Sequence, residues 1–145
     1  MIKSVLVVCV GNICRSPVGE RLLANLCPHL RIESAGISAL AGHEADDTMA
    51  KVANAANLNL DGHIARQFTA DIATEFDLVL ALEKGHIRVI TEKAPEVSGK
   101  TMLLGQWINP QEIPDPYRRS EEFCGLVFEE IVRACNSWAK KLGAA

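Results

Sequence analysis

The sequence has no excess of positive charge, no cysteine pair spaced for a metal ion and no apolar run long enough to cross a bilayer. Its 145 residues carry 15 Lys and Arg against 18 Asp and Glu, so no overall positive field attracts nucleic acid or an anionic membrane surface. The apolar start, "MIKSVLVVCV", lacks both a spanning length and a small-residue cleavage site, which predicts a strand in a cytoplasmic protein without membrane insertion. We therefore expect that any anion this protein binds is held by a few nearby side chains and backbone N–H groups, and not by the charge of the whole protein.

None of the five cysteines lies in the C-x-x-C spacing of a zinc site or a thioredoxin-like motif, and the four histidines add no ligand set. An odd number of cysteines in a chain of this length is typical of reduced thiols, so we expect no metal. Cys27, Cys124 and Cys135 are expected to be small buried hydrophobes. Three histidines carry no signal above that of exposed polar residues: His29, His43 and His86.

Short apolar runs alternate with longer helical patterns along the whole chain, without internal repeats or low-complexity segments. This alternation predicts an α/β fold: a single three-layer domain over residues 1–145, with a four-stranded parallel sheet and helices on both faces. The predicted strands are residues 4–8, 31–35, 77–82 and 100–105.

The helix signals lie between these runs. The first helix is expected to have Ser16 as its N-cap and Pro17 as its first residue, and the last to start near Ser120. Residues 106–120 form a long loop with three prolines, which is typical of a functional segment. The other helices are expected from about Asp46, after Thr69 as a cap, and over "EKGHIRVITEKAP", interrupted early by Gly85 and ended by Pro95.

Residues 9–16, "CVGNICRS", join the first predicted strand to the first predicted helix. Parallel sheets bind ligands at the carboxyl ends of their strands, and the first strand-to-helix turn often holds phosphate. Gly11 and Asn12 tolerate positive φ, which would turn successive backbone N–H groups inward around an anion. Arg15 offers a planar fork for two phosphate oxygens. The loop is therefore predicted to bind a phosphoryl group.

Cys9 lies at the base of this loop, where the positive end of a helix and a guanidinium favour the thiolate form. The alternative is a buried structural cysteine beside a solvated arginine, the usual reading of a lone cysteine at a strand end. Neither G-x-x-x-x-G-K-[ST] nor G-x-G-x-x-G occurs, which argues against a nucleotide cradle. The combination of features favours a nucleophile inside an anion site.

The stretch "VCVGNICRSP" resembles the C-x5-R-[ST] signature of the low-molecular-weight protein tyrosine phosphatases. A bare C-x5-R occurs by chance, but the resemblance covers essentially the whole chain. It is strongest to the enterobacterial members that act on the tyrosine kinases of capsule and exopolysaccharide export. The further matching segments are "SAG" at 34–36, "GHIARQ" at 62–67, "FDLVLALE" at 76–83 and "IPDPYRRS" at 113–120.

The resemblance implies a two-step phosphoryl transfer without a cofactor. Cys9 would attack phosphorus to give a phosphocysteine, and Asp115 would protonate the leaving tyrosyl oxygen and later activate water. Ser16 would donate its hydroxyl to the thiolate. The phosphate-binding residues would be Val10, Gly11, Asn12, Ile13, Cys14, Arg15 and Ser16, through their backbone N–H groups and the Arg15 side chain.

Other positions are implied to support this chemistry. His63 would steady the loop by hydrogen bonding towards Asn12 and Ser16, while Leu40 and Tyr117 would flank the substrate ring. Cys14 would be able to form a protective disulfide with the nucleophile. The implied partner is a phosphotyrosine protein, in particular a membrane tyrosine kinase of polysaccharide export, and the protein is expected to be a monomer.

Three alternatives stay open, of which the first two use the same scaffold. Thiol-linked arsenate reductases use a further pair of cysteines after the third strand, and this chain has none between Cys27 and Cys124. Phosphoarginine phosphatases tend to carry Thr where this chain has Ile13, whose apolar side chain better suits a phenyl ring. A phosphotyrosine-binding module without turnover would need neither Cys9 nor Asp115.

Overall fold

The computed structural model describes residues 1–143 and contains one four-stranded sheet in the order β2-β1-β3-β4. Every neighbouring pair of strands is parallel, as the alternating pattern predicts. The central strand β1 is buried along its whole length, since both faces of the sheet are covered. The strands are β1 (Ser4–Cys9), β2 (Arg31–Gly36), β3 (Leu78–Ala81) and β4 (Thr101–Leu103).

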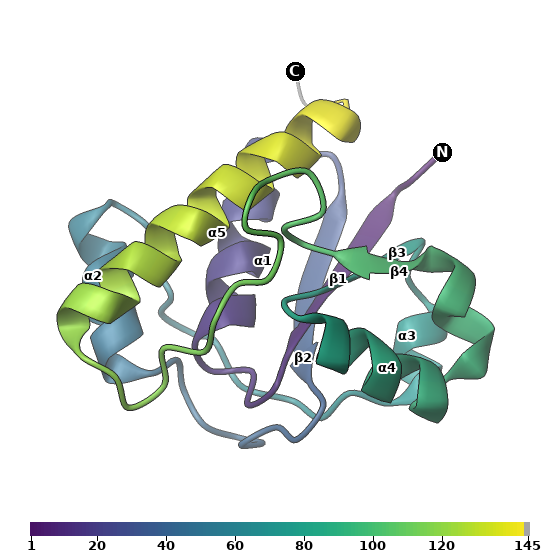
Figure 1. Cartoon of the computed structure of the whole chain (residues 1–145), viewed down its shortest axis with the longest axis horizontal. Helices are drawn as coiled ribbons and strands as arrows, with labels where there is room; N and C mark the ends of the chain where they lie inside the picture. The colour runs from purple at the N-terminus through teal and green to yellow at the C-terminus, as the bar shows by residue number, and fades with distance from the viewer. Residues whose placement is uncertain (144–145) are drawn as a thin grey trace.

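Helices cover both faces of the sheet, which confirms the three-layer prediction (Figure 1). On one face lie α1 (Arg15–Leu26) and α5 (Glu121–Lys141), with α2 (Asp47–Ala55) packed against α5. On the other lie α3 (Ala70–Thr74), α4 (Lys84–Lys93) and the 3-10 helix η1 (Pro95–Lys100). Side chains of β1 alternate between the two layers: Val5 and Val7 join the core of α1 and α5, and Leu6 and Val8 join the other.

Most of the predicted helix starts are confirmed by their caps. The side chains of Asp46, Thr69 and Ser120 each accept a hydrogen bond from the backbone N–H three residues on, at 3.0, 3.1 and 3.1 Å. This geometry satisfies one of the N–H groups that the first helical turn leaves unpaired. The predicted buried state of Cys27 and Cys135 is confirmed too, as is that of Cys124.

Two expectations about the helices are wrong. Helix α1 begins at Arg15 after Cys14, without a side-chain cap, so Ser16 is its second residue and not its N-cap. Helix α4 runs through Gly85 without a break. Glycine weakens a helix by about 1 kcal/mol relative to alanine, and packing of the buried residues Ile90 and His86 of α4 outweighs that cost.

The strands all point the same way, so their carboxyl ends meet at one edge of the sheet (Figure 1). Four loops leave this edge, namely residues 10–14, 37–46, 82–83 and 104–120. Among the described residues no helix is long and apolar enough to cross a membrane. The loops at the carboxyl edge contain most of the residues for which the sequence predicts a function.

Candidate active site

The loop of residues 10–14 turns its peptide carbonyls away from its own centre. Each carbonyl of residues 9–13 accepts a hydrogen bond from outside the loop. In a trans peptide the carbonyl and the next N–H point in opposite directions, so the N–H groups of residues 10–14 face inward. The result is a ring of converging donors, which is the geometry of an anion nest. The outside donors, in order, are Ile37 N, Ser38 N, Leu40 N, His63 Nε2 and Asp46 N, at 3.0, 3.0, 3.0, 2.6 and 2.8 Å.

Asn12 shapes the nest from a left-handed backbone conformation, with φ 60°. Its side-chain amide donates to Ser16 Oγ at 2.8 Å and to Ser34 Oγ at 3.0 Å, and its oxygen accepts from the N–H of Arg66 at 2.9 Å. The expectation that Gly11 also has positive φ is wrong: within residues 10–14 only Asn12 does. One left-handed residue beside a right-handed one is enough to make a nest, so a second was not needed.

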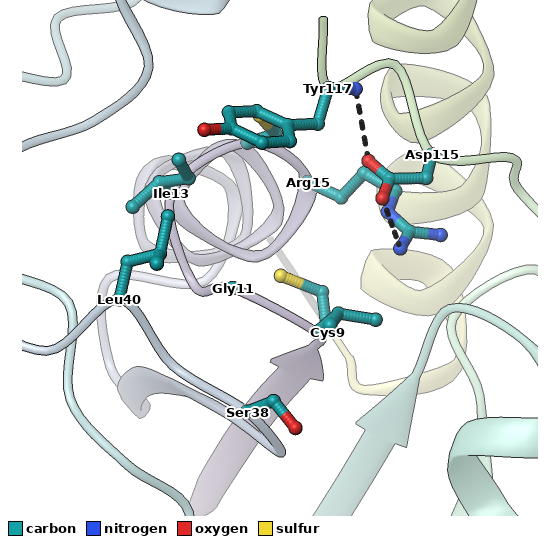
Figure 2. A pocket seen from close by; sticks show the side chains of 10 residues that line it. Cys9, Gly11, Ile13, Arg15, Ser38, Leu40, Asp115 and Tyr117 are labelled. Carbon is teal, nitrogen blue, oxygen red and sulfur yellow. Dashed lines mark hydrogen bonds and ion pairs between the residues drawn. The ribbon is translucent and has the colours of Figure 1, made fainter.

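Cys9 lies at the floor of the nest and its sulfur points into the open space above it (Figure 2). Cys9 Sγ is 2.9 Å from Ser16 Oγ. Since Ser16 Oγ already accepts the hydrogen bond from Asn12 Nδ2, its own proton is free to point at the sulfur. A hydroxyl that donates a hydrogen bond to the sulfur stabilises the thiolate form of Cys9.

The guanidinium of Arg15 is buried, with 1% of the residue exposed, and only part of it is paired. Nη1 donates to Glu83 Oε2 at 2.5 Å and to the carbonyl of Ile113 at 2.7 Å. Nε has no partner, and Nη2 has only the Asp115 carboxylate at 3.9 Å. The two nitrogens on one edge of the fork are thus left for a ligand with two oxygens, and a buried unpaired N–H is costly unless such a ligand binds.

Asp115, on the loop of residues 104–120, lies beside the guanidinium of Arg15 and on the opposite side of the cavity from Ile13 and Leu40 (Figure 2). Its side chain is 47% exposed, and its Oδ1 accepts a hydrogen bond from the N–H of Tyr117 at 3.0 Å. The same loop is fixed beneath Asp115 by Ile113, which is fully buried and donates its N–H to the Leu82 carbonyl. The backbone of this loop is therefore fixed close to Asp115, while the Asp115 carboxylate is open to solvent.

The cavity above Cys9 has a polar floor and apolar walls. Ile13, Leu40 and Tyr117 form one side, opposite Arg15, as Figure 2 shows. The cavity measures about 180 Å³. A protein cavity of roughly 150 Å³ accommodates a benzene ring, so this one has room for a single phenyl group. Leu40 and Tyr117 both line this cavity and are 37% exposed at its rim, and their contact with a substrate ring stays a prediction.

Support for the nest comes from behind it. His63 donates from Nε2 to the carbonyl of Asn12, but the expected contact of His63 with Ser16 is absent, because Asn12 reaches Ser16 instead. Arg66 bonds the Ser34 carbonyl through Nε at 3.0 Å and also pairs with Glu33. A Cβ on Gly36 would overlap the carbonyl oxygen of Val10, so the glycine of "SAG" lets the end of β2 pass directly under the loop.

Cys14 is buried beside the nest, with 4% of the residue exposed. Burial raises the pKa of its thiol far above the usual range, and the charge of Asp46 raises it further. This cysteine therefore stays protonated at neutral pH and is a poor nucleophile on its own. Its suggested disulfide with Cys9 stays a prediction, since both thiols are free here.

Some residues of the site were not predicted from the sequence. Glu83, which binds Arg15, comes from the segment after β3, as does His86, which lies 3.4 Å from Glu83 and is buried rather than exposed. Ser34 donates to Glu20 behind the nest at 2.5 Å. A charged residue directly after a buried strand, at the carboxyl edge, was the signal that could have pointed to Glu83. No group of three or more His, Cys, Asp or Glu within residues 1–143 is arranged to hold a metal ion.

A thiol at the centre of an anion nest, with a carboxylate on the wall of a cavity wide enough for one ring, defines the class of phosphatases that use a cysteine. A family model described as low molecular weight phosphotyrosine protein phosphatase matches residues 4–145. The chain therefore belongs to this family.

Individual relatives agree with this assignment. The chain is 51% identical to the Escherichia coli K12 low molecular weight protein-tyrosine-phosphatase Etp, over 97% of this chain and 95% of that one. The crystal structure of the tyrosine phosphatase Wzb from Escherichia coli K30 in complex with sulphate superposes with a TM-score of 0.97, at 48% identity over 98% of this chain and 99% of that chain. The structure of Vibrio vulnificus Wzb in complex with benzylphosphonate superposes with a TM-score of 0.95, at 45% identity over 97% of this chain and 99% of that chain.

Proposed function

We propose that this protein hydrolyses phosphotyrosine in proteins through a phosphocysteine intermediate, with Cys9 as nucleophile, Arg15 as the phosphoryl-binding side chain and Asp115 as acid and base. The observation that carries the proposal is the sulfur of Cys9 at the floor of a donor ring, with the unpaired edge of Arg15 beside it. That arrangement offers a place for a tetrahedral dianion directly above the sulfur.

In the first step the Cys9 thiolate attacks phosphorus and the bond from phosphorus to the tyrosyl oxygen breaks. The inward N–H groups of residues 10–14 and the fork of Arg15 bind the three equatorial oxygens, where charge lies in the transition state. The Asp115 carboxyl gives its proton to the departing phenolate. The exposed position of Asp115 at the rim, on the side from which the leaving group departs, suits this transfer.

In the second step water attacks phosphorus and the S–P bond breaks. Asp115, now a carboxylate, takes a proton from the water, and Cys9 leaves as a thiolate. The hydroxyl of Ser16, oriented by Asn12 towards the sulfur, stabilises that leaving thiolate. Inorganic phosphate is released and the starting state of the enzyme is restored.

The cavity walls favour an aryl phosphate over the other phosphoryl groups that this scaffold is expected to handle. Ile13 is 7% exposed and presents carbon to the site, together with Leu40 and Tyr117. A guanidinium of phosphoarginine would need polar partners on these walls, since a buried polar group without a hydrogen bond is costly. The benzylphosphonate bound by the Vibrio vulnificus relative is an aryl-substituted phosphoryl analogue of the same shape.

The resemblance to enterobacterial members supports a proposal for the protein substrate. We propose that the substrate is an autophosphorylated membrane tyrosine kinase, that its dephosphorylation regulates capsule or exopolysaccharide production, and that the phosphatase acts as a cytoplasmic monomer. The similarity to Etp and to the Wzb proteins supports this assignment.

The activity is tested with purified protein, without added metal, on one peptide sequence carrying phosphotyrosine, phosphoserine or phosphoarginine. We expect turnover of the phosphotyrosine peptide only, and a phosphorylated Cys9 after acid quenching of the reaction. Cys9→Ser, which keeps the fold and the anion nest, is expected to bind the peptide without turning it over. Binding without hydrolysis by the wild-type protein would reduce the site to a phosphotyrosine-binding module.

The partner is tested with the cytoplasmic domain of the tyrosine kinase from the capsule-export system of the same cell. The Cys9→Ser variant should retain the autophosphorylated domain and release the same domain after treatment with an unrelated phosphatase. If the variant retains the autophosphorylated and the dephosphorylated domain equally, or retains neither, the assignment of the partner is wrong. The proposed activity on phosphotyrosine peptides does not depend on this result.

A further inference from the structure

The buried side chain of His86 lies behind the arginine of the nest and is not used by the chemistry described above. His86 is in the first turn of α4 and is 7% exposed. Its Nε2 is 3.4 Å from Oε2 of Glu83, and that same oxygen is 2.5 Å from Arg15 Nη1. The three residues form a line that starts in α4 and ends at the phosphate site.

The hydrogen-bonding state of His86 follows from its surroundings. Nδ1 is buried without a partner, whereas Nε2 faces a carboxylate. A proton on Nδ1 would be a buried donor with no acceptor, so the ring fits the neutral tautomer with its proton on Nε2. Burial and the positive charge of Arg15 lower the pKa of His86, which keeps the ring neutral at physiological pH, although Glu83 opposes this shift.

A donor at His86 Nε2 acts on Oε2 of Glu83, the one carboxylate oxygen that binds Arg15. Its side chain is 34% exposed, and its backbone is the N-cap of α4, which holds the carbonyl but leaves the side chain free to rotate. The charged groups that act on His86 are Arg15, Glu83, Asp115 and Glu112. Two of these groups, the carboxylates of Glu83 and Asp115, also contact the guanidinium of Arg15.

We propose that His86 is a positioning residue for phosphoryl transfer: it donates from Nε2 to Glu83, fixes the carboxylate against Nη1 of Arg15, and so keeps Nε and Nη2 aimed at the phosphoryl oxygens. The proposal rests on the proposed phosphatase function and extends it to a residue outside the cavity. His86 touches neither the substrate nor Cys9, and it acts only through Glu83 and Arg15.

The test compares two replacements of His86 on a phosphotyrosine peptide. His86→Leu removes the donor and keeps an apolar filler, and it is expected to lower kcat/KM by about tenfold, the value of one hydrogen bond to a charged group. His86→Gln keeps an N–H near the place of Nε2 and is expected to stay within about threefold of wild type. His29→Leu, at an exposed histidine, is the control and should change nothing.

A purely structural role gives the reverse order, because a buried packing position accepts leucine more readily than glutamine. The proposal is therefore overturned if His86→Leu keeps wild-type activity, or if His86→Gln is as slow as His86→Leu while both have wild-type melting temperatures. Should His86→Leu fail to fold, His86→Met provides the same comparison.

A double-mutant cycle tests whether the effect passes through Glu83. In a Glu83→Ala background His86 has no carboxylate to position. Adding His86→Leu to that variant should therefore lower kcat/KM by less than about twofold. The same tenfold loss in both backgrounds contradicts the proposal. A wild-type protein that does not hydrolyse phosphotyrosine would instead remove the proposed function, and with it this role of His86.

Discussion

The two loops that supply the chemistry differ in how firmly they are built. In the nest, Asn12 and Ser16 are fully buried and Arg15 nearly so, and every carbonyl of residues 9–13 has a partner. In the loop of residues 104–120, the side chain of Asp115 is 47% exposed. The group that must bind charge in the transition state is preorganised, which is where electrostatic stabilisation is most effective. The group that must exchange a proton with the leaving group and with water is at the solvent edge.

This contrast separates stability from catalysis. A change in the nest should reduce both the activity and the free energy of unfolding, since its side chains pack and pair in the interior. A change at Asp115 should reduce activity alone, because its side chain is 47% exposed and its contact with Arg15 Nη2 is long, 3.9 Å, and ion pairs that are open to solvent contribute little to stability.

Replacement of the buried arginine should give the largest effect. Arg15→Lys keeps the charge but loses the planar fork and the two bonds of Nη1 to Glu83 and Ile113. We expect kcat/KM on a phosphotyrosine peptide to fall by about 10³-fold, in the range of other arginines that stabilise a transferring phosphoryl group. The melting temperature should also fall. Steady-state kinetics and a thermal melt measure the two effects, and wild-type activity in the Arg15→Lys variant would contradict the binding role.

The acid loop should give a smaller and purely catalytic effect. Asp115→Asn removes the proton donor, so turnover of phosphotyrosine, whose phenolate is a poor leaving group, is expected to fall by about 10²-fold. Para-nitrophenyl phosphate, whose leaving group needs no proton, should lose far less. The melting temperature should match that of wild type. If both substrates slow equally, the general acid is another group.

Much of the fold, and less of the site, follows from the sequence. Caps such as Asp46 and Ser120 are local signals, because the side chain bonds a backbone N–H three residues away. The strands are readable because β1 and β3 are buried on both faces and therefore continuously apolar. Features of this kind can be predicted from a short stretch of sequence, without knowledge of the tertiary structure.

The contacts around Arg15 are of another kind. Glu83 and Ile113 lie 68 and 98 residues away along the chain, and they meet Arg15 because β3 lies next to β1 in the sheet. The order of the strands is not written in any short stretch of residues. The same reason explains the error at Ser16: its hydroxyl is a suitable cap in isolation, but the buried contacts with Cys9 and Asn12 take it instead.

Asn12→Ala tests the part of the contrast that concerns stability. Alanine has to adopt the left-handed backbone conformation, and it also removes the hydrogen bonds that the Asn12 side chain makes with Ser16, Ser34 and the N–H of Arg66. We expect a loss of about 2–4 kcal/mol of unfolding free energy, most of it from the buried polar groups. Denaturant titration measures it.

The matched control for this change is Asn57→Ala. Asn57 also has positive φ, 63°, but it is exposed, so its replacement should cost only the backbone strain of about 1 kcal/mol. Equal losses at the two asparagines would mean that the polar network behind the nest contributes nothing to stability.

The smallest effect is expected at Leu40, a residue of the apolar rim that lies in neither of these two loops. Leu40 is 37% exposed, so a substrate ring covers only part of its side chain. Leu40→Ala therefore removes about 1 kcal/mol of apolar contact, which corresponds to a rise of about fivefold in KM with kcat little changed. The split arises because contact with the ring is present in the bound substrate and in the transition state alike, and such uniform binding acts on KM. Ile64→Ala, at an exposed isoleucine outside the cavity, is the control. A fall in kcat at unchanged KM would show that Leu40 acts on the chemical step, and the rim would then belong with the preorganised nest.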